Sequence, residues 1–442
     1  MQYPNKKIYD KSFLGPQTLS DNMKNNHVND DLSAAIDYRQ QIQARFHKNM
    51  SIDTELLIKA CEHIQKVFPG SFDNDELPLA ILRDYFIQNK IQDEMNLNQI
   101  EALINEKFND PSHPLRLMLG SNETAFDNFL STEVSKSYAQ DIEAACQRLQ
   151  IDLRSGVTVG ITHQEIIQAE QQPVFMTEAS VVNFTSNLHM LSHRASKLLA
   201  KSIAFEFIGE NNFKISNNLN DYKKLLISDP QLQRLWENFF ADYAYSPQNP
   251  PLGEPVYLDG FHVQTCYDDM RLAIDLFILS HEYGHHIAKH SSSGEVGAGT
   301  TSQEQSFFME HEADVIASKI VIDIGLQEDN YNFFASANLG AFCILKIIEL
   351  TKTANGILNG DIETLVSNPS SDHPPLVDRL GVIKTYIASY VYEGKSAKTI
   401  CKLIDMFCDL IDFIWHNSCK FIVNLKNQGV TPVTTDTTQW LP

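Results

Sequence analysis

The sequence predicts an α+β protein that is mostly helical, with a small antiparallel sheet and a helical N-terminal region. Apolar residues recur at helical spacing through most of the chain, whereas β-branched alternation is confined to short stretches such as residues 155–162. At 442 residues the chain exceeds the usual size of one core, so more than one subdomain is expected. The pattern divides the chain into a mobile leader at 1–30, a helical region at 31–150, a mixed α/β connecting region at 151–250, a main domain at 251–428 and a loose tail at 429–442.

The N-terminal third is expected to be helical after its leader. Residues 1–30 are polar and rich in Asn, Lys and Asp, which is typical of a mobile segment. No motif in this part indicates a chemical role, so packing is its simplest function. Apolar residues at helical spacing predict helices that begin near Asp31 and that cover 56–67, 77–91, 97–108 and 124–149.

Strands are predicted to enter the fold in the connecting region. Residues 155–162 alternate in β-branched side chains and predict a strand, 173–177 can supply a second, and 181–207 returns to helical spacing. After a Pro-rich loop, two short apolar runs around Asp259-Gly260 predict a tight hairpin over 256–264. An exposed strand edge there could hold an extended peptide through main-chain hydrogen bonds.

The main domain is expected to consist largely of helices. Residues 291–301 are small and flexible, which is typical of a connector, and 359–371 form a polar loop. The predicted helices contain the apolar run 272–279 and the segments 303–324, 333–352 (ended by Asn355-Gly356), the amphipathic stretch after Pro374-Pro375, and 399–424.

A metal-binding pattern closes the apolar run at 272–279. It reads His281-Glu282-Tyr283-Gly284-His285. Residues four apart lie on one face of a helix, so His281 and His285 can both bind one metal ion. Glu282 lies beside that face, where it can take a proton from a metal-bound water. Zinc is the expected metal, because it accepts imidazole and carboxylate ligands and leaves a position open with three protein ligands.

A third ligand is expected on the next helix. Glu310 and Asp314 are one turn apart and share a face, so Glu310 can complete a His2Glu site while Asp314 accepts the outward N–H of an imidazole, with His281 the first candidate. His311 could compete with Glu310, but its spacing to Asp314 does not match a helical turn. Glu312 points elsewhere and is interpreted as a solvated carboxylate.

These motifs resemble those of gluzincin metallopeptidases of the CAAX-prenyl-protease and HtpX type. That family combines HExxH and ExxAD with a later His-Pro…Arg element, and this chain has His373-Pro374 followed by Arg379. The resemblance covers about 255–390. It implies a zincin-like metallopeptidase core in the main domain, Glu310 as third zinc ligand, and His373 and Arg379 at the substrate-side wall, where they would steady the oxyanion or the substrate backbone. Many family members are integral membrane proteins, and membrane substrates are not carried over to this chain.

Two other histidine pairs have the same four-residue spacing. His286 and His290 lie on a face rotated by one residue step, about 100°, from that of His281, and no glutamate follows His286. His189 and His193 have no carboxylate motif nearby and are interpreted as partly exposed helix residues. Neither pair is expected to bind the catalytic metal.

Composition excludes some classes of partner. A formal net charge of −21 without clusters of Lys and Arg argues against nucleic acid. The seven cysteines form no CxxC pair and are expected to be reduced core thiols. The start has no apolar segment typical of a secretory signal, and the longest apolar runs are well short of the roughly 20 residues of a membrane span. A cytoplasmic location is therefore expected, with export by a signal-less route left open.

The leading functional hypothesis is a zinc-dependent endopeptidase that acts on a protein or peptide substrate. A metal-activated water would attack the peptide carbonyl, with Glu282 as general base and His373 and Arg379 as candidate oxyanion donors. Helical phase turns Tyr283 away from this site. One alternative is a narrow-specificity defence or effector protease that resembles the phage-exclusion protease Lit or the ImmA-type regulators. Another is a non-catalytic, metal-stabilised binding protein. The sequence indicates no particular oligomeric state.

Overall fold

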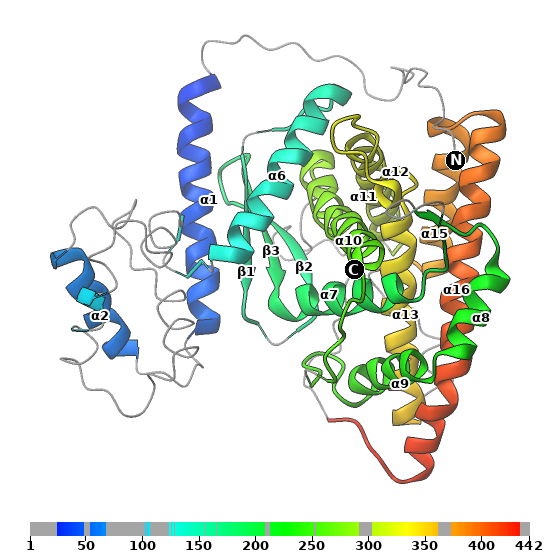
Figure 1. Ribbon diagram of the computed structural model, residues 1–442. Helices are drawn as coiled ribbons and strands as arrows, with labels where there is room; N and C mark the ends of the chain where they lie inside the picture. Colours follow the sequence, from blue (N-terminus) through cyan, green and yellow to red (C-terminus); the bar gives the residue numbers. More distant parts are fainter. Residues whose placement is uncertain are drawn as a thin grey trace.

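Long helices make up most of the computed structural model, and its strands form one three-stranded and one two-stranded sheet (Figure 1). The predicted class, mostly helical α+β, is confirmed at this level. The structure describes residues 24–47, 54–67, 102, 104–106, 123–124, 126–127, 129–154, 156–164, 166–207, 213–251, 253–290, 303–360 and 373–433.

The N-terminal region supplies two long helices, α1 (Lys24–His47) and α2 (Thr54–Val67). The predicted leader at 1–30 is too long, because α1 already begins at Lys24. Extending a helix that is anchored elsewhere adds one hydrogen bond per residue, so polar residues can join it without periodicity of their own. The helix predicted at 77–91 lies outside the described residues, and of the one at 97–108 only 102 and 104–106 are described, all of them helical.

A buried arginine fastens α1 to the rest of the chain. The Arg39 guanidinium donates to the Asp127 carboxylate at 3.1 and 3.2 Å, to the carbonyl oxygen of Val159 at 2.6 Å and to Glu123 at 2.8 Å. Val159 belongs to β1 (Val157–Thr162), beside which α1 lies in Figure 1. A buried charge is tolerated only with such partners, so this contact fixes α1 on the sheet.

The three-stranded sheet is mixed, which corrects the prediction of an antiparallel one. Its order is β1, β3 (Ser180–Thr185), β2 (Ala169–Pro173). β1 runs parallel to β3, and β2 runs antiparallel to it. The connection from β1 passes through β2 before it reaches β3, so β1 and β3 point the same way.

Of three sequence expectations in this region, one is confirmed and two differ from the structure. The strand at 155–162 is confirmed as β1, but the second strand ends at Pro173, where it was expected to begin. The helix predicted over 181–207 contains β3 in its first part and β4 (Phe205–Phe207) at its end. All residues of β3 are buried, so both faces are covered and the alternation that marks a strand is missing.

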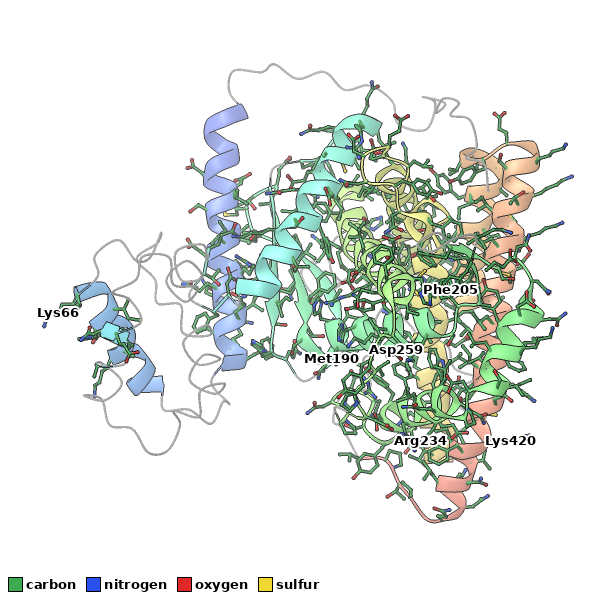
Figure 2. All side chains as sticks on the ribbon, in the orientation of Figure 1. Lys66, Met190, Phe205, Arg234, Asp259 and Lys420 are labelled. Carbon is green, nitrogen blue, oxygen red and sulfur yellow. The ribbon has the colours of Figure 1, made fainter. Side chains whose placement is uncertain are left out.

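Helices also cover the face of the three-stranded sheet opposite α1. α6 (Phe129–Leu149) precedes β1, and α7 (Ser186–Lys201) follows β3, with the Thr185 hydroxyl accepting from the Leu188 N–H as its cap. β4 pairs with β5 (Phe213–Ile215) in the two-stranded sheet. Figure 2 labels Phe205 in this hairpin, whose ring contacts Phe213 edge to face.

The hairpin predicted over 256–264 is absent from the described residues. Residues 253–260 follow α8 (Leu219–Ser228) and α9 (Pro230–Tyr245) without regular structure, and α10 (Phe261–Ala288) begins directly after Gly260. Gly260 has φ +90°, a conformation open to glycine, and it is the N-cap of α10. The Asp-Gly pair thus starts a helix here instead of turning a hairpin.

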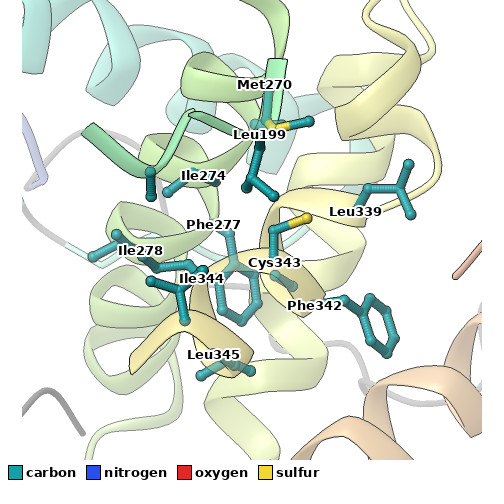
Figure 3. Close-up of a cluster of buried hydrophobic side chains, with 14 of the residues drawn as sticks. Leu199, Met270, Ile274, Phe277, Ile278, Leu339, Phe342, Cys343, Ile344 and Leu345 are labelled. Carbon is teal, nitrogen blue, oxygen red and sulfur yellow. The ribbon is translucent and has the colours of Figure 1, made fainter. Parts of the chain in front are cut away.

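The core is built on α10. It packs against α11 (Gln303–Gly325), α7 and α13 (Leu339–Asn359), and Figure 3 shows apolar side chains of α7, α10 and α13, such as Leu199, Phe277 and Cys343, meeting in the interior. One buried apolar cluster extends from Ala139 to Ile422. α11 matches its predicted span, which the periodic apolar residues at 303–324 had indicated.

The last helices close the fold. The segment predicted as one helix at 333–352 consists of α12 (Phe333–Ser336) and α13, which continues past Asn355 because that side chain donates to the Ala244 carbonyl on α9. α15 (Leu376–Tyr386) begins after Pro375, as predicted, and leads through a π-helical turn, η1 (Ile387–Val391), to α16 (Gly394–Asn427).

Side chains fill the space between α9, α13 and α16, with Arg234 and Lys420 at the surface (Figure 2). The segments 291–301 and 361–371 lie outside the described residues, as does the tail beyond Val433. Within the described part, no helix is both long enough and apolar enough to cross a membrane.

Candidate metal centre

Two imidazoles on α10 face the same point. His281 and His285 are one helical turn apart, and their Nε2 atoms are 3.1 Å from each other. His281 is 4% exposed, so its ring lies in the core and not on a solvated helix face. Two unprotonated nitrogens so close together repel each other unless a proton or a cation lies between them.

Glu310 on α11 completes the cluster. One carboxylate oxygen is 3.3 Å from Nε2 of His281 and the other is 3.4 Å from Nε2 of His285. One ligand atom from each of the three residues fits within 4.8 Å of the other two. The structure therefore brings together the three residues expected to be ligands, and it does not include His311 among them.

The spacing of these atoms fits zinc. Ligand atoms about 2.0–2.1 Å from a tetrahedral zinc ion lie roughly 3.3 Å from one another. The two imidazole Nε2 atoms are 3.1 Å apart, and a different Glu310 oxygen faces each of them, Oε2 at 3.3 Å from His281 and Oε1 at 3.4 Å from His285. Oε2 of Glu310 is buried and has no hydrogen-bond partner, although buried carboxylates normally have one. A cation among the three residues would satisfy it.

Glu282 lies beside the cluster and outside it. Its carboxylate is 3% exposed and accepts a hydrogen bond from the backbone N–H of Gln171 on β2. Burial is the main cause that raises its pKa to about 7, with the charge of Glu310 adding to the effect and that of His281 opposing it. A carboxylate with this pKa is suited to accept and return a proton near neutral pH.

A buried chain of hydrogen bonds holds β2 beside α10. The Gln171 amide donates to the Ser180 hydroxyl at 2.6 Å, and that hydroxyl is hydrogen-bonded to Nδ1 of His286 at 2.8 Å. Arg154 donates to the His286 carbonyl oxygen. His286 is thus a structural link between the sheet and the metal helix, which agrees with its exclusion as a ligand.

Asp314 contacts the ring nitrogen of His281 that does not face the ligand cluster. Its Oδ1 is 3.0 Å from Nδ1 of His281, at an angle short of a straight hydrogen bond. The Arg379 guanidinium binds the same carboxylate with two hydrogen bonds, of 2.8 and 2.7 Å. Burial alone would raise the pKa of Asp314, but the charge and hydrogen bonds of Arg379 outweigh it and lower the pKa. Asp314 is therefore held ionised next to His281.

Arg379 and His373 reach the centre in different ways. Arg379 is buried, its Nε and Nη2 are engaged by Asp314, and its Nη1 is 3.9 Å from Glu310. Its guanidinium thus lies next to the Asp314 and Glu310 carboxylates of α11, and the substrate-side position that the family resemblance implies stays a prediction. Nδ1 of His373 is 3.6 Å from Oε1 of Glu310, and its side chain is 30% exposed, the most open of the cluster.

Two residues beside the centre were missed. Nδ1 of His285 is 2.9 Å from Nδ1 of His290, and Nε2 of His290 is 3.1 Å from the Glu312 carboxylate. Lys289, with φ +61°, ends α10 in the left-handed conformation and turns His290 back toward His285. Glu312, expected to be solvated only, orients His290. Helical spacing could not have shown this, because His290 lies beyond the helix end.

The remaining candidates lie elsewhere. The Tyr283 hydroxyl donates to Glu143 on α6, away from the metal face, as its helical phase predicted. His189 and His193 both lie next to the Arg271 guanidinium, which identifies them as parts of a separate polar cluster.

Searches of protein-family models, of curated proteins and of solved structures find no match to this chain. The class of site thus rests on its own geometry. It is a buried His2Glu cluster on two packed helices, with a second carboxylate, Glu282, next to the ligands and not among them.

Proposed function

We propose that this protein is a zinc-dependent endopeptidase with a zincin-like core. The observation that carries the proposal is the cluster of His281, His285 and Glu310 beside the buried Glu282 carboxylate. Its imidazole nitrogens are 3.1 Å apart, and each lies within 3.4 Å of a Glu310 oxygen. A structural zinc site usually has four protein ligands and needs no additional base. Three ligands and an adjacent carboxylate favour catalysis.

Each residue has a defined task in this proposal. Zinc bound by the three ligands supplies a water of lowered pKa and a Lewis acid for the peptide carbonyl. Glu282 would hold the proton taken from the attacking water and return it to the leaving amine, and the Gln171 N–H holds its carboxylate in place. Asp314 and Arg379 keep His281 in the orientation and tautomer that a ligand requires.

We change two assignments made from the sequence: the residue that would donate to the oxyanion, and the strand that would hold the substrate. Of the two donors expected, His373 is partly exposed and close to Glu310, whereas the Arg379 donors face Asp314. We therefore assign the oxyanion contact to His373 and a positioning role to Arg379. Residues 256–260 form no strand, and the sheet edge nearest Glu282 is β2, through Gln171.

The test compares wild type with Glu282→Gln and Glu310→Ala in a cell lysate, with newly formed peptide N-termini and bound zinc as readouts. Glu282→Gln is expected to keep zinc and lose at least about 10²-fold in activity, because only the base is removed. Glu310→Ala is expected to lose zinc as well. Glu143→Gln, on the far side of α10, is the matched control and should retain both.

Zinc-bound wild-type protein that generates no new N-termini in lysates or from unfolded proteins would contradict the proposal. Loss of zinc from Glu282→Gln would instead identify Glu282 as a ligand.

A further inference from the structure

The face of the three-stranded sheet that α1 covers is unusually polar. In the register of the strands, Asn183 on β3 lies between Gly160 on β1 and Glu170 on β2, and paired residues share one face. Thr185, the next residue of β3 on this face, lies opposite Thr162. A sheet face covered by a helix normally carries apolar side chains, so these residues need another explanation.

A cavity of about 210 Å³ lies between α1 and this polar face. Tyr38 and Phe46 of α1 form one wall, and Glu170, Asn183 and Thr185 contribute to the other. The cavity includes none of the three metal ligands. It is therefore a second site, with flat aromatic surface facing hydrogen-bonding groups.

Asn183 indicates that the cavity has a ligand. The residue is 6% exposed, and neither its Nδ2 nor its Oδ1 has a hydrogen-bond partner in the described part of the chain. A buried amide with both groups unpaired loses its hydration without replacement, and such groups in native proteins are satisfied by other protein groups, by ordered water or by a bound ligand.

Glu170 is a hydrogen-bond acceptor in the cavity, so a ligand there needs an N–H or O–H donor. Burial raises the pKa of its carboxyl group, and the Gln172 side chain hydrogen-bonds to it. Among the described residues, no Lys or Arg forms an ion pair with it. The site thus presents acceptors at Glu170 and Asn183 Oδ1 and a donor at Asn183 Nδ2, and the exposed Arg45 side chain, which also lines the cavity, adds a charged donor.

These requirements select among chemical groups. A carboxylate cannot donate to Glu170 or to Asn183 Oδ1, and an ammonium or guanidinium group cannot accept from Asn183 Nδ2. A primary carboxamide has two N–H donors and one acceptor on a planar group. We propose that the cavity binds a primary carboxamide, with its N–H groups donated to Asn183 and Glu170, its oxygen accepting from Asn183, and its plane packed against Tyr38 and Phe46.

The carboxamide can belong to a free small molecule or to a Gln or Asn side chain of a polypeptide. The charge of Glu170 raises the pKa of Glu282, so the two sites are electrostatic neighbours. Binding itself does not depend on the metal centre, and the proposal can therefore hold or fail separately from the peptidase activity.

The experiment measures binding to the full-length protein by saturation-transfer NMR and calorimetry with matched pairs. Glutamine is compared with glutamate, and nicotinamide with nicotinate. Each amide is expected to bind at least about tenfold more tightly than its acid, because the acid leaves the donor requirement of the site unmet. A capped peptide, acetyl-Ala-Gln-Ala N-methylamide, is compared with free glutamine. If the peptide binds more tightly, the natural carboxamide belongs to a polypeptide; if glutamine binds more tightly, it belongs to a free small molecule.

Two variants complete the test. Asn183→Leu removes both unpaired groups at similar volume and should abolish amide binding while the melting temperature stays or rises. Ser196→Ala, which removes another buried unpaired hydroxyl away from the cavity, should bind as wild type does. Equal binding of amides and acids by wild type, no binding of either, or amide binding that survives in Asn183→Leu would overturn the proposal.

Discussion

At the residue scale, the centre is organised by two buried carboxylates with lowered pKa values, Glu310 mainly through hydrogen bonds with His281 and His373 and Asp314 mainly through Arg379. Glu310 and Asp314 are both nearly inaccessible to solvent, and burial alone would favour their neutral forms. The charge of Arg379 helps to lower the pKa of each, most directly through its two hydrogen bonds to Asp314. Arg379 therefore keeps negative charge available where a cation is expected to bind.

Arg379→Ala is expected to leave Asp314 as an uncompensated buried charge. Breaking such a pair costs about 3–5 kcal/mol of stability, and a lost supporting contact weakens zinc binding by roughly 10- to 100-fold. Urea unfolding and zinc competition with a chelator measure the two effects. If the variant instead keeps its stability and zinc affinity but has a lower kcat, Arg379 acts on the oxyanion, as the family resemblance implies.

At the element scale, the ligands meet because α10 and α11 approach closely at Gly284. A Cβ on Gly284 would lie 2.9 Å from Cα and the carbonyl oxygen of Ala313. Gly284 stands between the two ligand histidines, and Ala313 stands between Glu310 and Asp314. The two small residues let the helix backbones touch at the position where the three ligands must converge.

Gly284→Ala is expected to push α10 and α11 apart. The added Cβ would meet the Ala313 backbone, which cannot move aside as a flexible side chain could. Overpacking of this kind costs about 1–3 kcal/mol, and it should lower zinc affinity because Glu310 moves away with α11. Gly381→Ala is the matched control. It is also helical, a Cβ there meets nothing within 4 Å, and it should gain up to about 1 kcal/mol from helix propensity. Denaturant unfolding and zinc titration of Gly284→Ala that match wild type would contradict this account.

At the scale of the whole molecule, α1 and the main core are held by separate interactions. Apolar residues of α1 and of the chain beneath it form their own small cluster: Ala35 and Ile42 from α1, and Val174, Ala179 and Val181. The main cluster, which contains α10, runs from Ala139 to Ile422. The chief polar contact between α1 and the sheet is Arg39 with Asp127 and Val159.

Arg39→Met should therefore release α1 without opening the metal centre. It removes the ion-pair partner of the buried Asp127, whose carboxylate keeps hydrogen bonds from the Gln43 amide and from the Glu123 and Thr124 N–H groups. The cost should therefore lie below the roughly 3–5 kcal/mol of a fully uncompensated buried charge. Hydrogen exchange should accelerate along α1 and stay slow in α10, with zinc content unchanged. Asp37→Asn, on the exposed side of α1, is the control. Faster exchange in α10 as well would show that the molecule unfolds as one unit.

The sequence determined the parts that depend on consecutive residues. Helical spacing indicated α10 and α11 and the common face of His281 and His285, and it distinguished Glu310 from His311. Each of these rests on the fixed 100° step between neighbours in a helix. The same rule separated Tyr283 and His286 from the metal face.

Tertiary structure alone decided which distant groups meet. β3 is buried on both faces, so its pairing between β1 and β2 left no alternation to detect, and Asp259-Gly260 began a helix although the same pair often turns a hairpin. Arg379 faces Asp314, and His290 meets His285, only because segments far apart or beyond a helix end are packed together. Periodicity encodes which face a residue occupies, whereas the partner on that face depends on how whole elements pack.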